Sequence, residues 1–389
     1  MRGSRRVLLG ASALAVAGLA VAAYSAVSSD GTQTPETSSS APVEPPGRIW
    51  VDPDHLMSRP VEGRAWQRLK ARADSDLGEA DIADQDSDHD IDTLAVALVA
   101  ARTQDPAYFA KARAALMDVI GTDENRDRDC EVGPDRARAL SLGRNLPSYV
   151  IAADLIGLRP DADPRSEGSR FAAWVDTVRF KPNCPNVRDG EPLNLSEEHD
   201  SSGSNGSAMA GAARIAAAAY LGDDDELDAA WDTYRRYSGD RSVGPDLTFN
   251  EPGLSWAADE DEPVAINPAG STKDGHRIDG AIINDIGRGD AFDWPPEHTQ
   301  YHWEGTAGYY VQAQLLDRAG YDSWNVSDDA PRRVMEFNRS LAEELGDEWW
   351  DHTDWAKYLA NFVYGLDLPI SGPADEGKNM AWTDWLFGE

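Results

Sequence analysis

The chain has 389 residues, and 69 Asp and Glu against 36 Lys and Arg give it a formal net charge of −33. A chain this acidic lacks the basic surface that nucleic-acid binding requires, so we expect no nucleic-acid partner. Its two cysteines give no support for a cysteine-based metal site, and it carries no P-loop, dinucleotide-binding or zinc-protease motif. We therefore expect no metal and no cofactor.

The N-terminus has the pattern of an export signal. Arg5 and Arg6 precede an apolar run over residues 7–23, and small residues follow. The local sequence resembles the twin-arginine signal. We predict that residues 1–26 are removed, although an uncleaved membrane anchor is the alternative. The protein is then secreted, or periplasmic if the source has an outer membrane, and it touches a membrane only if the signal stays attached.

Residues 27–48 are rich in Ser, Thr, Pro and Glu and cannot bury a core, so they are predicted to be a disordered spacer. Residues 49–389 are long enough for one large domain, which we expect to be monomeric. Outside the cytoplasm the cysteine pair can be oxidised, and we predict a disulfide between Cys130 and Cys184, with two buried free thiols as the alternative.

Apolar residues then recur at helical spacing along most of the domain. The patterns predict helices over 66–73, 94–101, 106–120, 208–219, 227–234, 303–311, 334–341 and 355–363, and one more that Pro147 restarts and that runs to 156. Asp105 and Pro106 suit the start of a helix, and Gly121 and Gly222 suit helix ends. Strand signals are few. We predict an all-α fold of antiparallel helix pairs, either a bundle or a ring of helical hairpins.

Two long polar stretches, 180–206 and 238–301, interrupt the helical pattern. They are rich in Gly, Pro, His and Trp, and loops of this length in a compact domain are usually functional. We therefore place the functional site there. A third polar stretch, 84–92, is strongly acidic and suits the N-terminus of the helix that follows, with a second role for His89 in lining a cleft.

One group of side chains in these stretches suits β-elimination. Arg288 is followed by Tyr301 at the start of a helix, and His199 and Asn205 precede the alanine-rich helix. Elimination beside a uronic-acid carboxyl needs donors that neutralise the carboxylate, a base for the C5 proton, and an acid for the leaving oxygen. Carboxylates are so abundant that a two-carboxylate glycoside hydrolase stays open as an alternative.

At these residues the chain resembles the alginate-lyase-type family of polysaccharide lyases. The resemblance spans about residues 50–389. It is carried by the stretches DQDSDHDIDTLAVAL, ALSLGRNLPSYVIAADLIGL, GSNGSAMAGAARIAAAAYLGD, INPAGSTKDGHRIDG and RGDAFDWPPEHTQYHWEGTAGYYVQAQLLDRAGY, and by the tail NFVYG…KNMAWTDW. It implies an (α/α) toroid, a ring of helical hairpins around a cleft, and a substrate that is an acidic polysaccharide or oligosaccharide such as alginate.

The resemblance also implies roles for individual residues. Tyr301 matches a tyrosine that serves relatives as acid and often as base, while Arg288 and Asn205 match residues that neutralise the carboxylate. The chain departs from the family where relatives have Asn-Asn-His or Asn-Asn-Trp, because here Gly206 follows Asn205. His199, which is nearby but displaced, is then the expected base. The departure leaves an inactive glycan-binding relative as a further alternative.

Other basic and aromatic residues are expected to contact the substrate. They are His89, Arg144, His276, Trp294, His302 and Trp303. Because a polyanion is repelled by an acidic protein, the cleft must also be less acidic than the exterior. The basic groups that could make the cleft less acidic are Lys273, Arg277 and Arg288, together with Arg144 and the histidines.

Overall fold

The structure is a computed structural model, and it describes residues 49–124, 139–182, 187–188, 191–244, 247–288, 290–346, 349, 354–370, 372 and 380–388. These residues belong to one compact unit that begins at Pro45. The predicted export signal and spacer lie outside the described residues, and so do Cys130 and Cys184 with their predicted disulfide.

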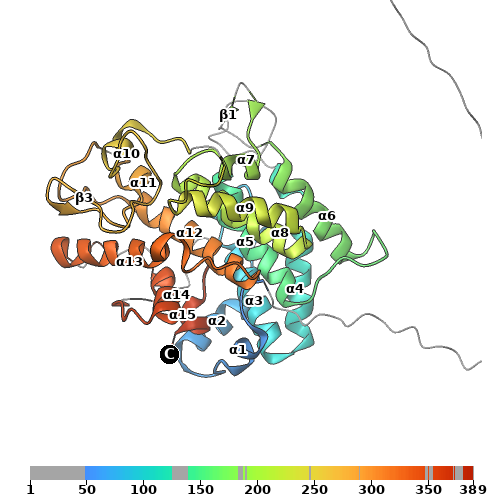
Figure 1. Ribbon diagram of the computed structural model, residues 1–389. Helices are drawn as coiled ribbons and strands as arrows, with labels where there is room; N and C mark the ends of the chain where they lie inside the picture. Colours follow the sequence, from blue (N-terminus) through green and yellow to red (C-terminus); the bar gives the residue numbers. More distant parts are fainter. Residues whose placement is uncertain are drawn as a thin grey trace, which may run out of the picture. The chain divides into compact units, whose positions relative to one another are not determined.

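The unit is mostly helical (Figure 1). Its helices are α1 (Pro53–Ser58), α2 (Gly63–Asp74), α3 (His89–Thr103), α4 (Pro106–Asp118), α5 (Ala139–Leu155), α6 (Glu167–Phe180), α7 (Leu195–His199), α8 (Asn205–Leu221), α9 (Asp224–Tyr237), α10 (Glu251–Ser255), α11 (Ile283–Ile286), α12 (Gln300–Arg318), α13 (Val326–Leu345), α14 (Asp354–Tyr364) and α15 (Thr383–Phe387), with a 3₁₀ turn at Thr122–Glu124. Two antiparallel ribbons are formed by β1 (Val187–Arg188) with β2 (Glu191–Pro192), and by β3 (Thr272–Lys273) with β4 (His276–Arg277).

The alanine-rich helix α8 lies at the centre of the helical core. It packs most extensively against α5 and α12, and Figure 1 shows the three helices side by side. Small residues allow this close approach. A Cβ atom added at Gly143 of α5 would lie 2.8 Å from the backbone of Met209, and one added at Gly308 of α12 would lie 2.7 Å from the backbone of Ala208. The glycines therefore set the spacing of these helices.

Most of the predicted helices are confirmed, and their ends follow the expected physics. Asp105 caps α4 by accepting a hydrogen bond from the backbone N–H of Ala107, with Pro106 in the first turn. Gly222 ends α8 with a φ of 70°. The stretch 84–92 places acidic residues in the first turn of α3, as expected. Helix α6 was not predicted, although Ser166 caps it through the backbone N–H of Ser169.

The prediction that Pro147 restarts a helix is wrong, because α5 continues through it. Proline cannot donate a hydrogen bond to the carbonyl four residues earlier, which is that of Gly143. The packing of α5 against α3 and α8 compensates for this loss, and Gly143 is the point of closest approach to α8. Tertiary contacts thus override the local preference.

The second polar stretch, 238–301, carries short ordered elements. It contains α10, the β3–β4 ribbon and α11, and the backbone N–H of Ile283 donates to the carbonyl oxygen of Ala265. Helix α11 packs against α10 and against α12. Among the described residues, no helix is long and apolar enough to cross a bilayer. The described part of the chain also holds no group of three or more His, Cys, Asp or Glu residues arranged to hold a metal.

The close packing around α8 predicts that Gly308→Ala destabilises the protein. The new methyl group meets helix backbone, which must shift, and we expect a loss of ~1–3 kcal/mol in the free energy of unfolding. Gly206→Ala is the matched control, since its nearest neighbour is Ser204 Oγ at 3.7 Å. It should be neutral or slightly stabilising. Equal unfolding free energies for the two variants in urea denaturation would contradict this packing account.

Candidate functional site

The carboxyl group of Asp285, on α11, joins the long polar stretch to the helical core. Its Oδ1 accepts a hydrogen bond from the backbone N–H of Asn205, the first residue of α8, at 2.9 Å. The main-chain carbonyl of Asp285 accepts from the backbone N–H of Arg288 at 3.3 Å and from Thr299 Oγ1 at 3.4 Å. One residue thereby positions the start of α8, the turn that carries Arg288, and the start of α12.

The same carboxyl group is fully buried. Asp285 is 0 % exposed, and a Cβ atom at Gly305 of α12 would lie 2.3 Å from its Oδ2. Burial raises the pKa of Asp285 to about 8, although the hydrogen bond from Asn205 and the charge of Arg288 act in the opposite direction. Asp285 is therefore largely protonated at neutral pH, and it adds little negative charge to its surroundings.

Asn205 links the cationic and anionic groups around it. Its Oδ1 accepts a hydrogen bond from Arg288 Nη1 at 3.3 Å, and its Nδ2 donates to Glu304 Oε2 at 2.8 Å. The guanidinium of Arg288 lies 4.2 Å from the centre of the Tyr301 ring. On the other side, Glu304 Oε1 lies 4.0 Å from Arg144 Nη1 of α5.

We name Arg144, Asn205, Arg288, Tyr301 and Glu304 the amide cluster. The residues come from α5, α8, the turn after α11, and α12, so separate stretches of the chain meet at the N-terminus of α8. Arg288 is exposed and Tyr301 is half-buried, whereas Asn205 is buried. The positive end of the α8 dipole adds to the two guanidinium groups, so the cluster can attract an anion at its exposed side.

The predicted base His199 lies elsewhere. It is 1 % exposed, its Nδ1 lies 3.3 Å from Arg214 Nη1, and its ring contacts Gly211, six residues beyond Asn205 along α8. Burial, together with the neighbouring charge of Arg214, lowers the pKa of His199 to about 3. A neutral imidazole enclosed in the helical core cannot reach a polymer, so we do not retain it as the base.

Three other predicted contact residues are also enclosed. His302 and Trp303 are each 0 % exposed, and Trp303 Nε1 donates to the carbonyl oxygen of Trp349 at 2.8 Å. Burial lowers the pKa of His302 to about 4. His89 is buried at the start of α3, and its Nδ1 lies 2.9 Å from the hydroxyl of Tyr149. These rings pack the core and do not face the amide cluster's exposed side.

Of the predicted basic groups, Arg144 and Arg288 belong to the amide cluster. Lys273 forms an ion pair with Glu260 at 2.6 Å, and Arg277 pairs with Asp279 and Glu336. His276 and Trp294 stack on each other with ring centres 4.5 Å apart, and Trp294 Nε1 donates to Glu344. Lys273 and Arg277 are thus neutralised by acidic neighbours, as surface pairs commonly are.

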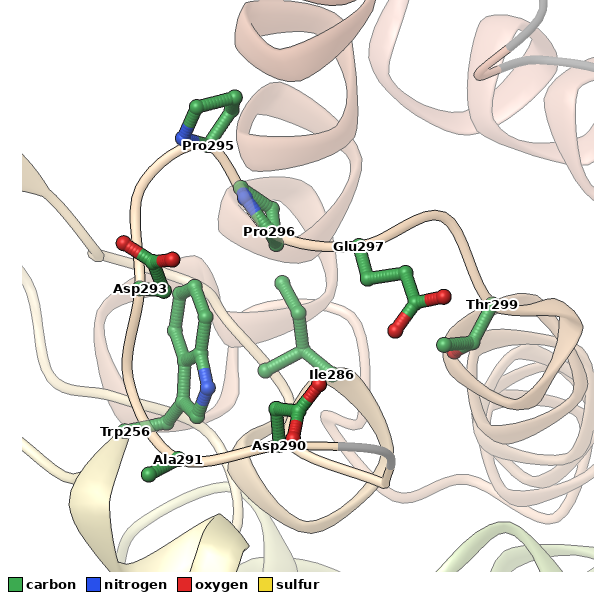
Figure 2. Close-up of a pocket in the computed structure, with 9 residues that line it drawn as sticks. All are labelled: Trp256, Ile286, Asp290, Ala291, Asp293, Pro295, Pro296, Glu297 and Thr299. Carbon is green, nitrogen blue, oxygen red and sulfur yellow. The ribbon is translucent and has the colours of Figure 1, made fainter.

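A cavity of about 490 Å³ opens beside the amide cluster (Figure 2). Thr299, which hydrogen-bonds to Asp285, forms part of its wall, and Asp290 lies two residues after Arg288. The remaining lining residues are Trp256, Ile286, Ala291, Asp293, Pro295, Pro296 and Glu297. Among the described residues, the lining therefore carries three carboxylates and no basic side chain, in contrast to the neighbouring cluster.

Comparison with known proteins adds no relative: no protein-family model matches the chain, and no curated protein matches it. The geometry alone therefore carries the functional argument. Sequence reasoning identified Asn205, Arg288 and Tyr301, which do meet, but it missed Asp285 and Glu304. The available signals were that Asp285 lies three residues before Arg288, and that Glu304 lies about one turn after Tyr301 on the same helix.

The buried carboxyl of Asp285 predicts a pH-dependent contribution to stability. The folded pKa is raised above the unfolded value of 3.8, so the folded state binds the extra proton and stability falls as pH rises from about 4 to 8. The slope approaches about 1.4 kcal/mol per pH unit for one proton. Asp285→Asn removes this titration. The melting temperature of the variant should therefore rise relative to that of the parent as the pH increases from 5 to 8. A constant difference between the two proteins would contradict a protonated Asp285.

Proposed function

We propose that this protein is a secreted polysaccharide lyase that cleaves a uronate-containing polymer by β-elimination at the amide cluster. The observation that supports the proposal is the meeting of Asn205, Arg288 and Tyr301, which lie far apart in the sequence. The Arg288 guanidinium contacts both the Asn205 amide and the Tyr301 ring, and an amide, a guanidinium and a phenol are the groups that the reaction requires. The resemblance to alginate-lyase-type enzymes and their (α/α) toroid belongs to the same proposal, and the mostly helical fold is compatible with it.

In the proposed mechanism the uronate carboxylate binds to Arg288 and Asn205. Their donors offset its charge and stabilise the negative charge that spreads from C5 onto the carboxylate as the proton leaves. The electron pair of the C5–H bond forms a C4–C5 double bond, and the bond from C4 to the glycosidic oxygen breaks. Tyr301 removes the C5 proton and supplies a proton to the leaving oxygen, so no water is consumed.

Tyr301 serves as both base and acid in this scheme because His199 is enclosed. The half-buried ring of Tyr301 lies at the start of α12, next to the exposed guanidinium of Arg288. In this scheme Tyr301 takes the C5 proton as a phenolate, is a neutral phenol between the two transfers, and returns to the phenolate when it protonates the leaving oxygen. The cation against the ring offsets the negative charge of the phenol oxygen before the first transfer and after the second. The arrangement also keeps both transfers on one face of the sugar.

A glycoside hydrolase is the second candidate, because two carboxyl groups flank Asn205. Asp285 is largely protonated and Glu304 accepts from the Asn205 amide, a division that suits an acid and its partner. However, Asp285 is 0 % exposed and bonded to the start of α8, so it cannot protonate a glycosidic oxygen. We therefore favour elimination, with Asp285 as a residue that positions Asn205 and Arg288.

Replacement of Arg288 tests the assignment of the cluster. Arg288→Ala removes a contact that strengthens in the transition state, so kcat/KM should fall at least ~100-fold, or ~2.7 kcal/mol, while the melting temperature changes little. Turnover is followed by the near-ultraviolet absorbance of the 4,5-unsaturated uronate on alginate, polymannuronate, hyaluronan, heparosan and pectate.

Arg241→Ala is the matched control, because Arg241 forms a surface pair with Glu262 outside the cluster. It should retain the parent activity. Added salt should first raise the activity of both the parent and this control, since it screens repulsion between the acidic protein and the polyanion. If Arg288→Ala keeps kcat/KM within about threefold of the parent, ~0.7 kcal/mol, the site is misplaced.

Replacement of Glu304 tests whether the base is Tyr301, as proposed, or the neighbouring Glu304. Glu304→Gln preserves an acceptor for Asn205 Nδ2 and removes a negative charge beside the place where the uronate carboxylate binds. We expect KM to fall several-fold and kcat to stay within about threefold. A loss of kcat of ~100-fold or more, with KM unchanged, would assign the base to Glu304 and contradict the role given to Tyr301.

A further inference from the structure

The cavity beside the amide cluster is suited to a ligand of its own. Its volume of about 490 Å³ falls in the range of roughly 300–1,000 Å³ that is usual for small-molecule sites. The wall residue Thr299 is hydrogen-bonded to Asp285, which also positions Asn205. A sugar in the cavity would therefore be close to a uronate held by the cluster.

The charge of the cavity differs from that of the cluster. Asp290, Asp293 and Glu297 line it, and within the described part of the chain none of the three has a cationic side chain at ion-pair distance. Figure 2 shows Asp290 and Glu297 on the same side of the Trp256 indole as Ile286, and Asp293 at the opposite edge of that ring. A carboxylate ligand would be repelled here, whereas an ammonium group would be attracted.

A buried donor gives an independent sign of a ligand. Trp256 is 2 % exposed, and its Nε1 has no hydrogen-bond partner among the residues that the structure describes. Gly287 lets the five-membered ring of the indole approach closely, since a Cβ there would lie 2.8 Å from Trp256 Cδ1. Figure 2 shows the indole nitrogen on the side of the ring that faces Ile286 and Asp290. A buried N–H without an acceptor is unfavourable, and a hydroxyl oxygen of a ligand in the cavity would give it one.

We propose that this cavity binds an amino sugar, with its protonated amine attracted by the lining carboxylates Asp290, Asp293 and Glu297 and a ring hydroxyl accepting from Trp256 Nε1. The inference rests on the proposed function, because it makes the substrate a copolymer of uronate and N-unsubstituted hexosamine. The cluster holds the uronate and the cavity holds the neighbouring amino sugar. A homopolymer of uronates would place a second carboxylate among three others, so alginate and pectate become poor substrates.

The first test is a binding measurement that requires no turnover. Glucosamine is titrated into ¹⁵N-labelled protein, and the indole N–H signal that disappears in Trp256→Phe is followed. We expect a saturable shift of this signal, with at least tenfold weaker binding of N-acetylglucosamine and no shift with glucuronate. Equal affinity for N-acetylglucosamine would overturn the recognition of an ammonium group. Equal affinity for lysine amide would overturn the assignment to a sugar.

Paired variants identify the carboxylates. The double variant Asp293→Asn with Glu297→Gln should weaken glucosamine binding at least tenfold, while Asp261→Asn, an exposed acid outside the lining, should leave it unchanged. Added salt should weaken binding to the parent, because the contact is ionic. Unchanged binding in the double variant would overturn the proposal.

The second test separates the cavity from the reaction. Heparosan and its de-N-acetylated form share their linkages and differ in the acetamide or ammonium group, so the parent should cleave the latter at least tenfold faster. Elimination without glucosamine binding would overturn the amino-sugar site and leave the lyase assignment standing. Glucosamine binding without unsaturated product on either polymer would overturn the lyase, while the binding site itself would stand.

Discussion

The hydrogen bond from the Asn205 backbone to the Asp285 carboxyl is the contact on which the site depends. It fastens the polar stretch 238–301 to the first residue of α8, where α5, α8 and α12 meet. Because burial keeps Asp285 protonated at neutral pH, the contact adds little negative charge beside the proposed binding place of the uronate carboxylate. Gly305 provides the space for this carboxyl group. The main-chain carbonyl of Asp285 also accepts a hydrogen bond from the turn that carries Arg288.

The acidity of the chain makes charge separation the second constraint. A net charge of −33 opposes a polyanionic substrate, and the ion pairs of Lys273 and Arg277 show that a basic residue near the site does not ensure a basic site. Two guanidinium groups and the N-terminus of α8 instead meet at one point. The neighbouring cavity has the opposite character, because three carboxylates line it.

Helical periodicity and capping predicted most of the long helices, because amphipathic patterns and caps are local properties of sequence. The same reasoning predicted that Asn205, Arg288 and Tyr301 act together. It could not predict that His199, His302 and Trp303 would be enclosed, since a polar or aromatic residue next to a loop has no local mark of burial. Asp285 and Glu304 were missed for a related reason: in a chain with 69 acidic residues, only tertiary contacts distinguish the few that matter. Pro147 within α5 shows the same dependence on packing.

The central claim is that cleavage at the amide cluster proceeds by elimination, and the masses of the products test it most directly. Exhaustive digestion of a uronate-containing oligosaccharide of known length is followed by mass spectrometry. Elimination adds no water, so the fragment with the new non-reducing end should be lighter by one water molecule than the corresponding hydrolysis product, and this species should be absent with Tyr301→Phe. Fragments that each carry the full mass of a hydrolysed sugar would contradict elimination and favour the hydrolase.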